Sequence, residues 1–221
     1  MSPTEYKLLI FDWDGTLADS IGRIVTAMQV AARRADRPER DADSVKGIIG
    51  LGLPEAILTL YPDMTHEQVI AFRQHYADVY MAMDAEPSPL FAGVRESLEV
   101  FRAQGYRLAV ATGKARRGLD RVLKAHGWEE FFDITCAADE TASKPDPLML
   151  NRILAHCDVR PEQALMVGDA SFDLLMARNA GIDSVAVGYG AQSMERLLTF
   201  EPKLAIDSFP ELRAWLGRQA N

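Results

Sequence analysis

Short runs of consecutive apolar residues recur along the chain and predict buried strands. The four strongest runs are Lys7–Phe11, Arg107–Ala111, Ala164–Gly168 and Ser184–Gly188. A fifth, weaker candidate is Phe131–Cys136. Because these runs do not alternate between apolar and polar positions, they are typical of strands that are covered on both faces.

Helical patterns separate the later strands. They cover Val94–Gln104, Ala115–His126 and Phe172–Ala180, and the last two stop at Gly127 and Gly181, which are good C-terminal signals. Strands that alternate with helices favour a parallel sheet with helices on both faces. We therefore predict an α/β fold built on a Rossmann-like, doubly wound parallel sheet.

Residues 19–87 differ from the rest because they contain no strand-like run. Apolar residues between positions 21 and 32 recur at helical spacing, and a second helix is predicted over Thr65–Met83. The turn-rich stretch Glu86–Gly93 follows. We expect an α/β core made of residues 1–18 and 88–221, with a small all-helical domain, residues 19–87, inserted after the first strand.

Composition narrows the class of protein. The 221 residues are 48% hydrophobic, enough for a core without disulfide bonds, and Cys136 and Cys157 lie outside any metal-ligand spacing, so both are predicted to be reduced thiols. The net charge of −8 disfavours binding to nucleic acid or to an anionic membrane, because both need a basic face.

The chain does not start like a signal peptide and has no run of about 18 apolar residues, so we expect a cytoplasmic protein without a membrane span. Neither the charge nor the three tryptophans predicts an oligomeric state.

Two aspartates stand one residue apart at the end of the first strand, in Asp12-Trp13-Asp14-Gly15-Thr16. Asp-Gly alone is a common turn, but a turn does not explain a second carboxylate at the end of a buried strand. A divalent cation would offset the repulsion between the two carboxylates. Mg²⁺ suits this role because it prefers oxygen ligands and needs only one or two carboxylates beside a phosphate oxygen and water.

Two further stretches offer groups that bind phosphate. Thr112-Gly113-Lys114 ends the second strand, where a hydroxyl and backbone amides could hold a phosphate oxygen, although a threonine there is also a common helix N-cap. Lys144 lies in the loop Ser143–Pro147, which its prolines stiffen, although a loop lysine is usually solvated.

The last stretch, Gly168–Asp173, follows the strand Ala164–Gly168 and places Asp169 and Asp173 four residues apart. The alternative interpretation is an N-cap aspartate with a surface aspartate behind it. Ligands of open α/β sheets bind at the carboxyl ends of the strands. The four stretches could therefore converge on one site.

Taken in this order, the four motifs resemble those of the haloacid dehalogenase superfamily, in its phosphatase branch. The family pattern is DxDGT, a strand-end Ser or Thr, a loop Lys and GDxxxD, matched here at Asp12–Thr16, Thr112, Lys144 and Gly168–Asp173. The resemblance covers the predicted α/β core, and the helical insert is similar to the mobile cap that such proteins carry after the first motif. Phosphoglycolate-phosphatase-like members look most similar.

The resemblance implies a role for each aspartate. Asp12 would be the nucleophile that forms an aspartyl-phosphate, and Asp14 the acid that protonates the leaving alcohol and then the base that activates water. Mg²⁺ would be bound by the Asp12 carboxylate, the Asp14 backbone carbonyl and Asp169. Asp173 would be either a further ligand or the holder of a metal-bound water.

The remaining motif residues would bind substrate. Thr112, Gly113 and Lys144 would hold the phosphoryl oxygens, and Lys144 would also offset the charge of Asp12. Together these features predict a Mg²⁺-dependent phosphomonoester hydrolase that acts on a small phosphorylated metabolite, with phosphoglycolate as the first guess. In the cap, Arg23, Lys46 and the loop Gly50–Leu53 are candidates for facing the site, and Gly188–Gly190 is predicted to be a loop near its rim.

Single residues favour or disfavour the other activities of the same superfamily. Asp14 argues against the dehalogenase branch, because a halide leaves without a proton. The phosphomutase branch usually has an arginine after the cap-loop glycine. This chain has Leu51 and Leu53 there, which disfavours a phosphomutase. A phosphonate-cleaving enzyme needs a cap lysine. Lys46 is the only lysine in residues 19–87, so this activity stays open as an alternative. A non-catalytic regulatory protein is disfavoured because Asp12 and Asp14 are both present.

Overall fold

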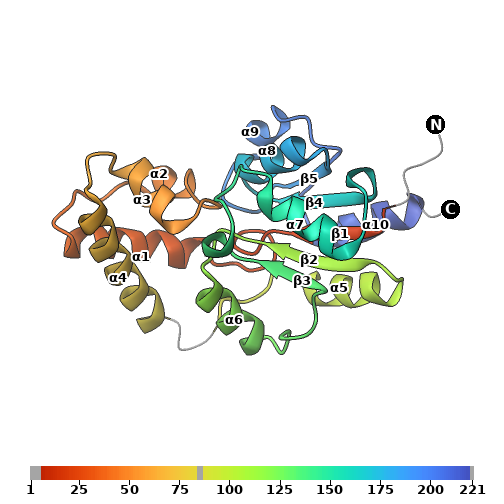
Figure 1. Ribbon diagram of the computed structural model, residues 1–221, viewed down its shortest axis with the longest axis horizontal. Coiled ribbons are helices and arrows are strands. Elements are labelled where there is room, and N and C mark those ends of the chain that lie inside the picture. The colour runs from red at the N-terminus through yellow and green to blue at the C-terminus, as the bar shows by residue number, and fades with distance from the viewer. Residues whose placement is uncertain (1–5, 84–86, 220–221) are drawn as a thin grey trace.

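A six-stranded parallel sheet forms the centre of the molecule (Figure 1). The computed structural model describes residues 6–83 and 87–219. In sheet order the strands are β3 (Ile134–Cys136), β2 (Arg107–Ala111), β1 (Leu8–Phe11), β4 (Ala164–Gly168), β5 (Asp183–Val187) and β6 (Leu204–Ile206). The chain moves outward from β1 to β3 and then returns to the other side of β1, so the sheet is doubly wound, as predicted.

Helices cover both faces of the sheet. Leu9 and Phe11 of β1 belong to a core that includes side chains of α5 (Val94–Ala103), α6 (Arg116–Ala125) and α10 (Phe209–Gln219). The alternate residues of β1 face a second core, which includes α7 (Leu148–Cys157) and α8 (Ser171–Ala180). Strands buried on both faces account for the runs of apolar residues that lack alternation.

Shorter elements complete this part of the chain. They are the 3-10 helices η1 (Ala138–Glu140) and η2 (Pro161–Gln163) and the helix α9 (Met194–Leu198). Cys136 and Cys157 are both buried and free, as predicted. Among the described residues, no helix combines the length and apolar character that crossing a membrane requires.

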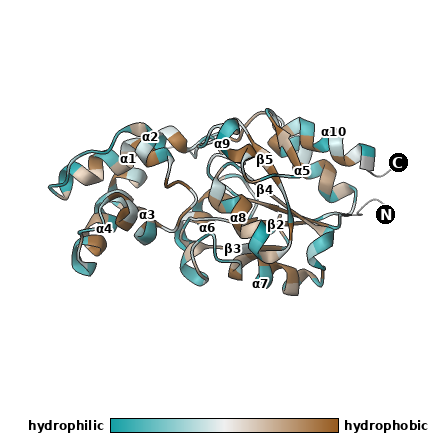
Figure 2. Ribbon diagram, turned by 90° about the horizontal axis from the view of Figure 1, so that it is seen from above, coloured by the Kyte–Doolittle hydropathy of each residue, from teal (hydrophilic) through white to brown (hydrophobic). Residues whose placement is uncertain are grey.

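Four helices between β1 and α5 form a separate layer, here called the helical insert: α1 (Ile21–Arg34), α2 (Ala42–Lys46), α3 (Leu53–Leu60) and α4 (His66–Ala82). They lie together to one side of the sheet, opposite the chain termini (Figures 1 and 2). The insert has its own apolar core, and Thr65 begins α4 with a capping box that Gln68 completes. The expected boundary at Pro87 adjoins residues 84–86, which lie outside the described residues, as do residues 1–5 of the expected first core segment.

The sheet brings the predicted motifs to one edge. β2, β1 and β4 are neighbours, and Phe11 is in register with Val110 on one side and with Val167 on the other. The residues that follow these strands therefore emerge side by side. This edge faces the helical insert (Figure 1).

Candidate functional site

Three buried carboxylates meet at this edge. Asp12 directly follows β1, Asp169 directly follows β4, and Asp173 lies in the first turn of α8. One carboxylate oxygen from each lies within 4.8 Å of the others. Each of the three residues is at most 1% exposed. Sequence analysis predicted all three residues and their convergence, and the geometry brings them together.

Lys144 supplies the positive charge in this cluster. Its Nζ lies 2.7 Å from Oδ1 of Asp12 and 2.7 Å from Oδ1 of Asp173, and the residue is 1% exposed. The alternative prediction, that Lys144 is a solvated lysine in a loop, is therefore wrong. Burial lowers the pKa of Lys144, but its pairing with Asp12 and Asp173 outweighs this effect and raises the pKa above its ordinary value.

The cluster carries more negative charge than Lys144 balances. Burial raises the pKa of Asp12, an effect that Lys144 opposes, and burial together with the charges of Asp12 and Asp173 raises the pKa of Asp169. Three carboxylates against one ammonium leave two negative charges, which one divalent cation would balance. Among the described residues, Oδ2 of Asp12 is buried without a hydrogen-bond partner. The cluster thus fits a hard cation such as Mg²⁺ both in charge and in its oxygen donors.

Asp169 is held by groups from two loops. Its Oδ1 accepts a hydrogen bond from Thr16 Oγ1 at 3.0 Å, and its Oδ2 accepts one from the Ala191 backbone amide at 2.6 Å. A Cβ at Gly15 or Gly190 would overlap the Asp169 side chain, so both positions require glycine. The loop Gly188–Gly190 therefore lies against the site, as predicted.

Asp173 has both carboxylate oxygens engaged. Oδ1 accepts from Lys144, and Oδ2 accepts from the backbone amide of Ala170 at 3.1 Å. The alternative interpretation made Asp169 the N-cap, but the N-cap of α8 is Ala170, and Asp173 rather than Asp169 accepts the hydrogen bond from its amide. A surface position is wrong, because the side chain is fully buried.

Asp14 has a different environment from Asp12, although only one residue separates them. Its Oδ1 accepts a hydrogen bond from Ser20 Oγ at 2.5 Å and lies 2.9 Å from Lys114 Nζ. The ammonium of Lys114 also lies 5.2 Å from the centre of the Tyr80 ring, which belongs to α4. Burial lowers the pKa of Lys114, whereas Asp14 and Tyr80 raise it, and the net shift is upward. The Asp14 carboxylate is therefore held beside a cation of its own, Lys114, whereas Asp12 pairs with Lys144.

Thr112 and Gly113 extend from the end of β2. Thr112 is fully buried, and its Oγ1 accepts a hydrogen bond from the Lys114 backbone amide at 3.2 Å, which leaves the hydroxyl proton available for another acceptor. A Cβ at Gly113 would lie 2.5 Å from the carbonyl oxygen of Leu51 and 2.7 Å from that of Gly50. The core and the helical insert therefore approach at backbone distance here.

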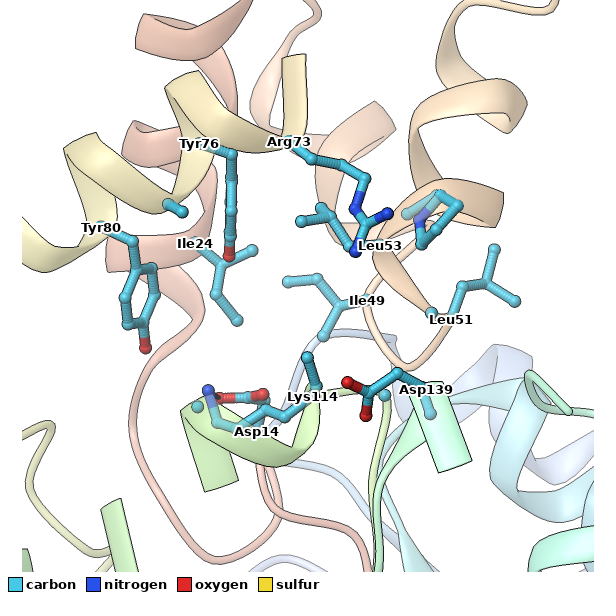
Figure 3. A pocket seen from close by; sticks show the side chains of 18 of the residues that line it. Asp14, Ile24, Ile49, Leu51, Leu53, Arg73, Tyr76, Tyr80, Lys114 and Asp139 are labelled. Carbon is cyan, nitrogen blue, oxygen red and sulfur yellow. Dashed lines mark ion pairs between the residues drawn. The ribbon is translucent and has the colours of Figure 1, made fainter. Parts of the chain in front are cut away.

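A cavity of about 550 Å³ lies between the insert and the sheet edge, and Asp12 and Asp14 form part of its floor. Figure 3 shows Tyr76 and Tyr80 of α4 above Asp14 and Lys114, with Ile49 and Leu51 on the wall. The loop Gly50–Leu53 lines the cavity, as predicted. Arg23 and Lys46 are not among the lining residues, so these two candidates were wrong. The ammonium of Lys46 lies 3.5 Å from Asp43.

Sequence reasoning missed several groups that line the cavity. Arg73, Tyr76 and Tyr80 occur at positions i, i+3 and i+7 of α4, a spacing that predicts a shared helix face but not what the face contacts. Lys114 stands directly after a predicted site residue. Its position beside Asp14 depends on the turn between β2 and α6, which no sequence pattern specifies.

Comparisons with known proteins agree with this architecture. The family model for haloacid dehalogenase-like hydrolases matches residues 9–187. The chain is 36% identical over 211 residues to the "Probable phosphatase IndB" of Dickeya dadantii, covering 93% of this chain and 91% of that protein. It is 31% identical over 220 residues to a phosphoglycolate phosphatase of Vibrio vulnificus, covering 96% of each chain.

A solved structure shows the same fold. The haloacid dehalogenase-like family hydrolase of Streptococcus pneumoniae superposes with a TM-score of 0.81 at 26% identity, covering 95% of this chain and 98% of that chain. The chain belongs to the haloacid dehalogenase-like hydrolase family. The predicted superfamily is confirmed, and the names of the relatives agree with the predicted phosphatase branch.

Proposed function

We propose that this protein is a Mg²⁺-dependent phosphomonoester hydrolase that works through an aspartyl-phosphate intermediate. The observation that carries the proposal is the buried cluster of Asp12, Asp169 and Asp173 around Lys144, in which one oxygen of Asp12 has no hydrogen-bond partner among the described residues. Family membership and the phosphatase names of the relatives support it.

In the first step a carboxylate oxygen of Asp12 forms a bond to phosphorus, and the bond from phosphorus to the ester oxygen breaks. Asp14 gives its proton to that oxygen, so that the alcohol leaves neutral. Different partners hold the two aspartates in place. Lys144 holds Asp12, while Ser20 and Lys114 hold Asp14 in one orientation.

In the second step a water oxygen attacks phosphorus and the bond to Asp12 breaks, which releases inorganic phosphate and restores the carboxylate. Asp14 accepts a proton from the attacking water and so returns to its starting state. A covalent intermediate divides one difficult displacement into two easier ones.

The Asp12 carboxylate, the Asp14 backbone carbonyl and Asp169 would hold Mg²⁺. When bound, the ion neutralises negative charge on the phosphoryl oxygens. Because Oδ1 of Asp173 lies 2.7 Å from Lys144 Nζ, we propose that Asp173 positions Lys144, besides serving either as a further ligand or as the holder of a metal-bound water. Thr112, Gly113 and Lys144 would bind the phosphoryl oxygens, since a hydroxyl, a backbone amide and an ammonium are preorganised donors.

We further propose that the helical insert acts as a cap that closes over bound substrate and excludes water. Its backbone meets Gly113, and the Gly52 amide donates a hydrogen bond to Ser143 Oγ at 2.8 Å, next to Lys144 in the chain. These contacts join the two parts of the molecule directly beside the reactive groups.

Phosphonate cleavage receives no support from the position of Lys46. Its side chain is 41% exposed, pairs with Asp43 and does not line the cavity, whereas an imine-forming lysine must reach the substrate. We propose a small phosphorylated metabolite as substrate, and phosphoglycolate is the first one to test because a relative carries that name.

The proposal is tested by phosphate release from a panel of phosphorylated metabolites, with Mg²⁺ and with a chelator. We expect wild-type protein to turn over at least one ester only when Mg²⁺ is present, and Asp12→Asn to lose roughly 10³-fold or more in kcat while keeping its circular dichroism spectrum. The Asn variant keeps the size of the side chain but removes the nucleophile. Full activity in Asp12→Asn, or no turnover of any ester by folded, Mg²⁺-loaded wild type, would overturn the proposal.

A further inference from the structure

The cavity above Asp12 and Asp14 is much larger than the alcohol part of phosphoglycolate requires. It encloses about 550 Å³. At about 30 Å³ per water molecule, a two-carbon hydroxy acid fills roughly 100 Å³. Cavities of about 300–1,000 Å³ commonly hold whole drug-sized ligands. The volume therefore fits an alcohol several times larger than glycolate.

The cavity lining also points away from a small, fully polar alcohol. Apart from Asp12 and Asp14 and the residues named below, its wall is built mainly from apolar side chains of the helical insert: Ile24, Met28, Ile48, Ile49, Leu51 and Leu53. Such a wall favours an alcohol with apolar surface, because burial of that surface stabilises the complex.

One face of α4 forms the opposite wall. Arg73, Tyr76, Ala77, Tyr80 and Met81 line the cavity at spacing i, i+3, i+4, i+7 and i+8, which is one face of a helix. The Tyr76 and Tyr80 rings stack with centroids 5.7 Å apart, and both rings reach down toward the floor (Figure 3). The rings pack with Ile24 and Ile49 in one apolar cluster, and this partly aromatic surface of the cavity favours contact with a flat ring of the ligand.

The same helix sets a distance between two charged ends of the cavity. Tyr80 lies beside Lys114 and Asp14, and Arg73 begins seven residues earlier, or about 10 Å along the helix axis at 1.5 Å per residue. The Arg73 side chain points into the cavity (Figure 3). Among the described residues, no hydrogen bond or ion pair engages its guanidinium.

Glycolate is too short to use this arginine. Its carboxylate lies three bonds from the ester oxygen, or about 3.8 Å by analogy with three backbone bonds. Four other charged side chains line the cavity, namely Glu55, Arg117, Arg121 and Asp139. The Asp139 carboxylate already accepts a hydrogen bond from the Arg116 backbone amide at 2.7 Å. Arg117 lies on the core wall and serves as the comparison for Arg73.

We propose that the preferred substrate is a phosphate monoester of a bulky alcohol that carries a flat ring next to the reaction centre and an acidic group at its far end, where Arg73 binds it. This inference rests on the proposed hydrolase function, because the cavity opens on Asp12 and Asp14. It assigns Arg73 and Tyr76 to substrate selection and makes phosphoglycolate a poor substrate.

The test uses three alkyl phosphates of graded structure: phosphoglycolate, 2-phenylethyl phosphate and 2-(4-carboxyphenyl)ethyl phosphate. All three esters have an alkyl leaving oxygen, so they differ mainly in the part that occupies the cavity. We expect kcat/KM to rise at least tenfold from phosphoglycolate to the phenyl ester, and about fivefold more with the carboxylate. Arg73→Gln should remove only the second gain, and the matched variant Arg117→Gln should keep both.

Binding of the same three esters to Asp12→Asn protein, measured by calorimetry, gives a second readout that does not need turnover. The same order of affinity is expected. If the esters bind in this order but wild type hydrolyses none of them, the hydrolase function is wrong and the ligand class stands. If phosphoglycolate is hydrolysed and bound as well as the aromatic esters, or if Arg117→Gln rather than Arg73→Gln removes the carboxylate gain, the inference is overturned.

Discussion

The sheet edge beneath the cavity and the α4 face that lines it, here called the two walls, are built on different physical principles. At the sheet edge, Asp12, Asp169, Asp173 and Lys144 are buried and bound to one another or to the backbone. On the α4 side, Arg73 reaches into the cavity from an exposed helical position. The first wall is held by charge pairing in a region of low dielectric, whereas the second depends on the shape and apolar surface of a helix face.

This difference separates reactivity from selection. Groups that must act on a phosphoryl centre need fixed positions, and the ends of three in-register strands supply them. Groups that select an alcohol need only the right surface. Substitutions on the two walls should therefore differ in kind: the first should impair both folding and turnover, and the second should change only which ester is used.

Removal of the buried ammonium should have the largest effect. Lys144→Met leaves Asp12 and Asp173 without their shared cation, so we expect the unfolding free energy in chelator to fall by about 3–5 kcal/mol and kcat by about 10²–10³-fold. Urea unfolding followed by tryptophan fluorescence measures the first quantity, and phosphate release measures the second.

Lys203→Met is the matched control for this variant. Lys203 pairs with Asp183 at 3.5 Å, but both side chains are more than a third exposed, so the cost should stay within about 1 kcal/mol. Similar losses in the two variants would contradict a special role for the buried pair.

Metal binding should stabilise the sheet edge by a smaller amount. At a Mg²⁺ concentration of 100 times the Kd, linkage adds about 2.7 kcal/mol to the unfolding free energy, which corresponds to a rise in Tm of roughly 5–10 °C for a chain of this size. Asp169→Asn should lose this rise, and differential scanning calorimetry with and without Mg²⁺ measures it.

The surface variant Asp63→Asn provides the comparison from the helical insert. The Asp63 side chain is 68% exposed and pairs with Arg37 of the helical insert, so the Mg²⁺-dependent rise in Tm should be unchanged. A full rise in Asp169→Asn would place the metal elsewhere.

The contact of Gly113 with the loop of the helical insert should show the smallest effect. Gly113→Ala places a methyl group against the carbonyl oxygens of Gly50 and Leu51, so we expect closure to weaken and kcat/KM to fall about tenfold, or 1.4 kcal/mol in transition-state free energy. Steady-state kinetics with the best available ester measures this change.

Gly118→Ala tests the same substitution where space is free. Gly118 also lines the cavity, lies inside α6 and has no atom near an added Cβ, so the change should leave kcat/KM intact and add about 0.5–1 kcal/mol of stability. Equal kinetic losses at both glycines would rule out the close approach as the cause.

Much of the sheet could be predicted because burial on both faces leaves a plain signal. β2 and β4 have the predicted limits, and β1 differs only by Lys7. β6 was missed because it has three residues at the sheet edge, and Leu204 and Ala205 are only partly buried. A short edge strand needs little apolar sequence, so periodicity does not reveal it.

In the helical insert, periodicity found the long helices and missed the short ones. α1 and α4 were predicted, whereas α2 and α3 span five and eight residues and give little periodic signal. Ile70 is an apolar residue of the second predicted helix, Thr65–Met83, but its side chain is 51% exposed. Periodicity shows which residues share one face of a helix, but it does not show which element packs against that face.

The candidate site, too, could be predicted only in part. Asp12, Thr112 and Asp169 could be placed because each directly follows a predicted strand, and strand ends are where open sheets bind ligands. The sequence could not predict that Lys144 is buried or that Lys114 pairs with Asp14, because both depend on how loops from different strands fold over one another. The roles of these site residues in the reaction stay predictions.

The cavity face of α4 has a consequence for the history of such proteins. Among the described residues, Arg73, Tyr76 and Met81 make no hydrogen bond to the strand-end cluster, whereas Tyr80 lies over Lys114, which pairs with Asp14. Mutations can therefore accumulate along one stripe of a single helix while the reactive groups are left intact. A gene duplicate could acquire a new metabolite in a few steps, and an engineer could randomise the same positions to redirect the enzyme.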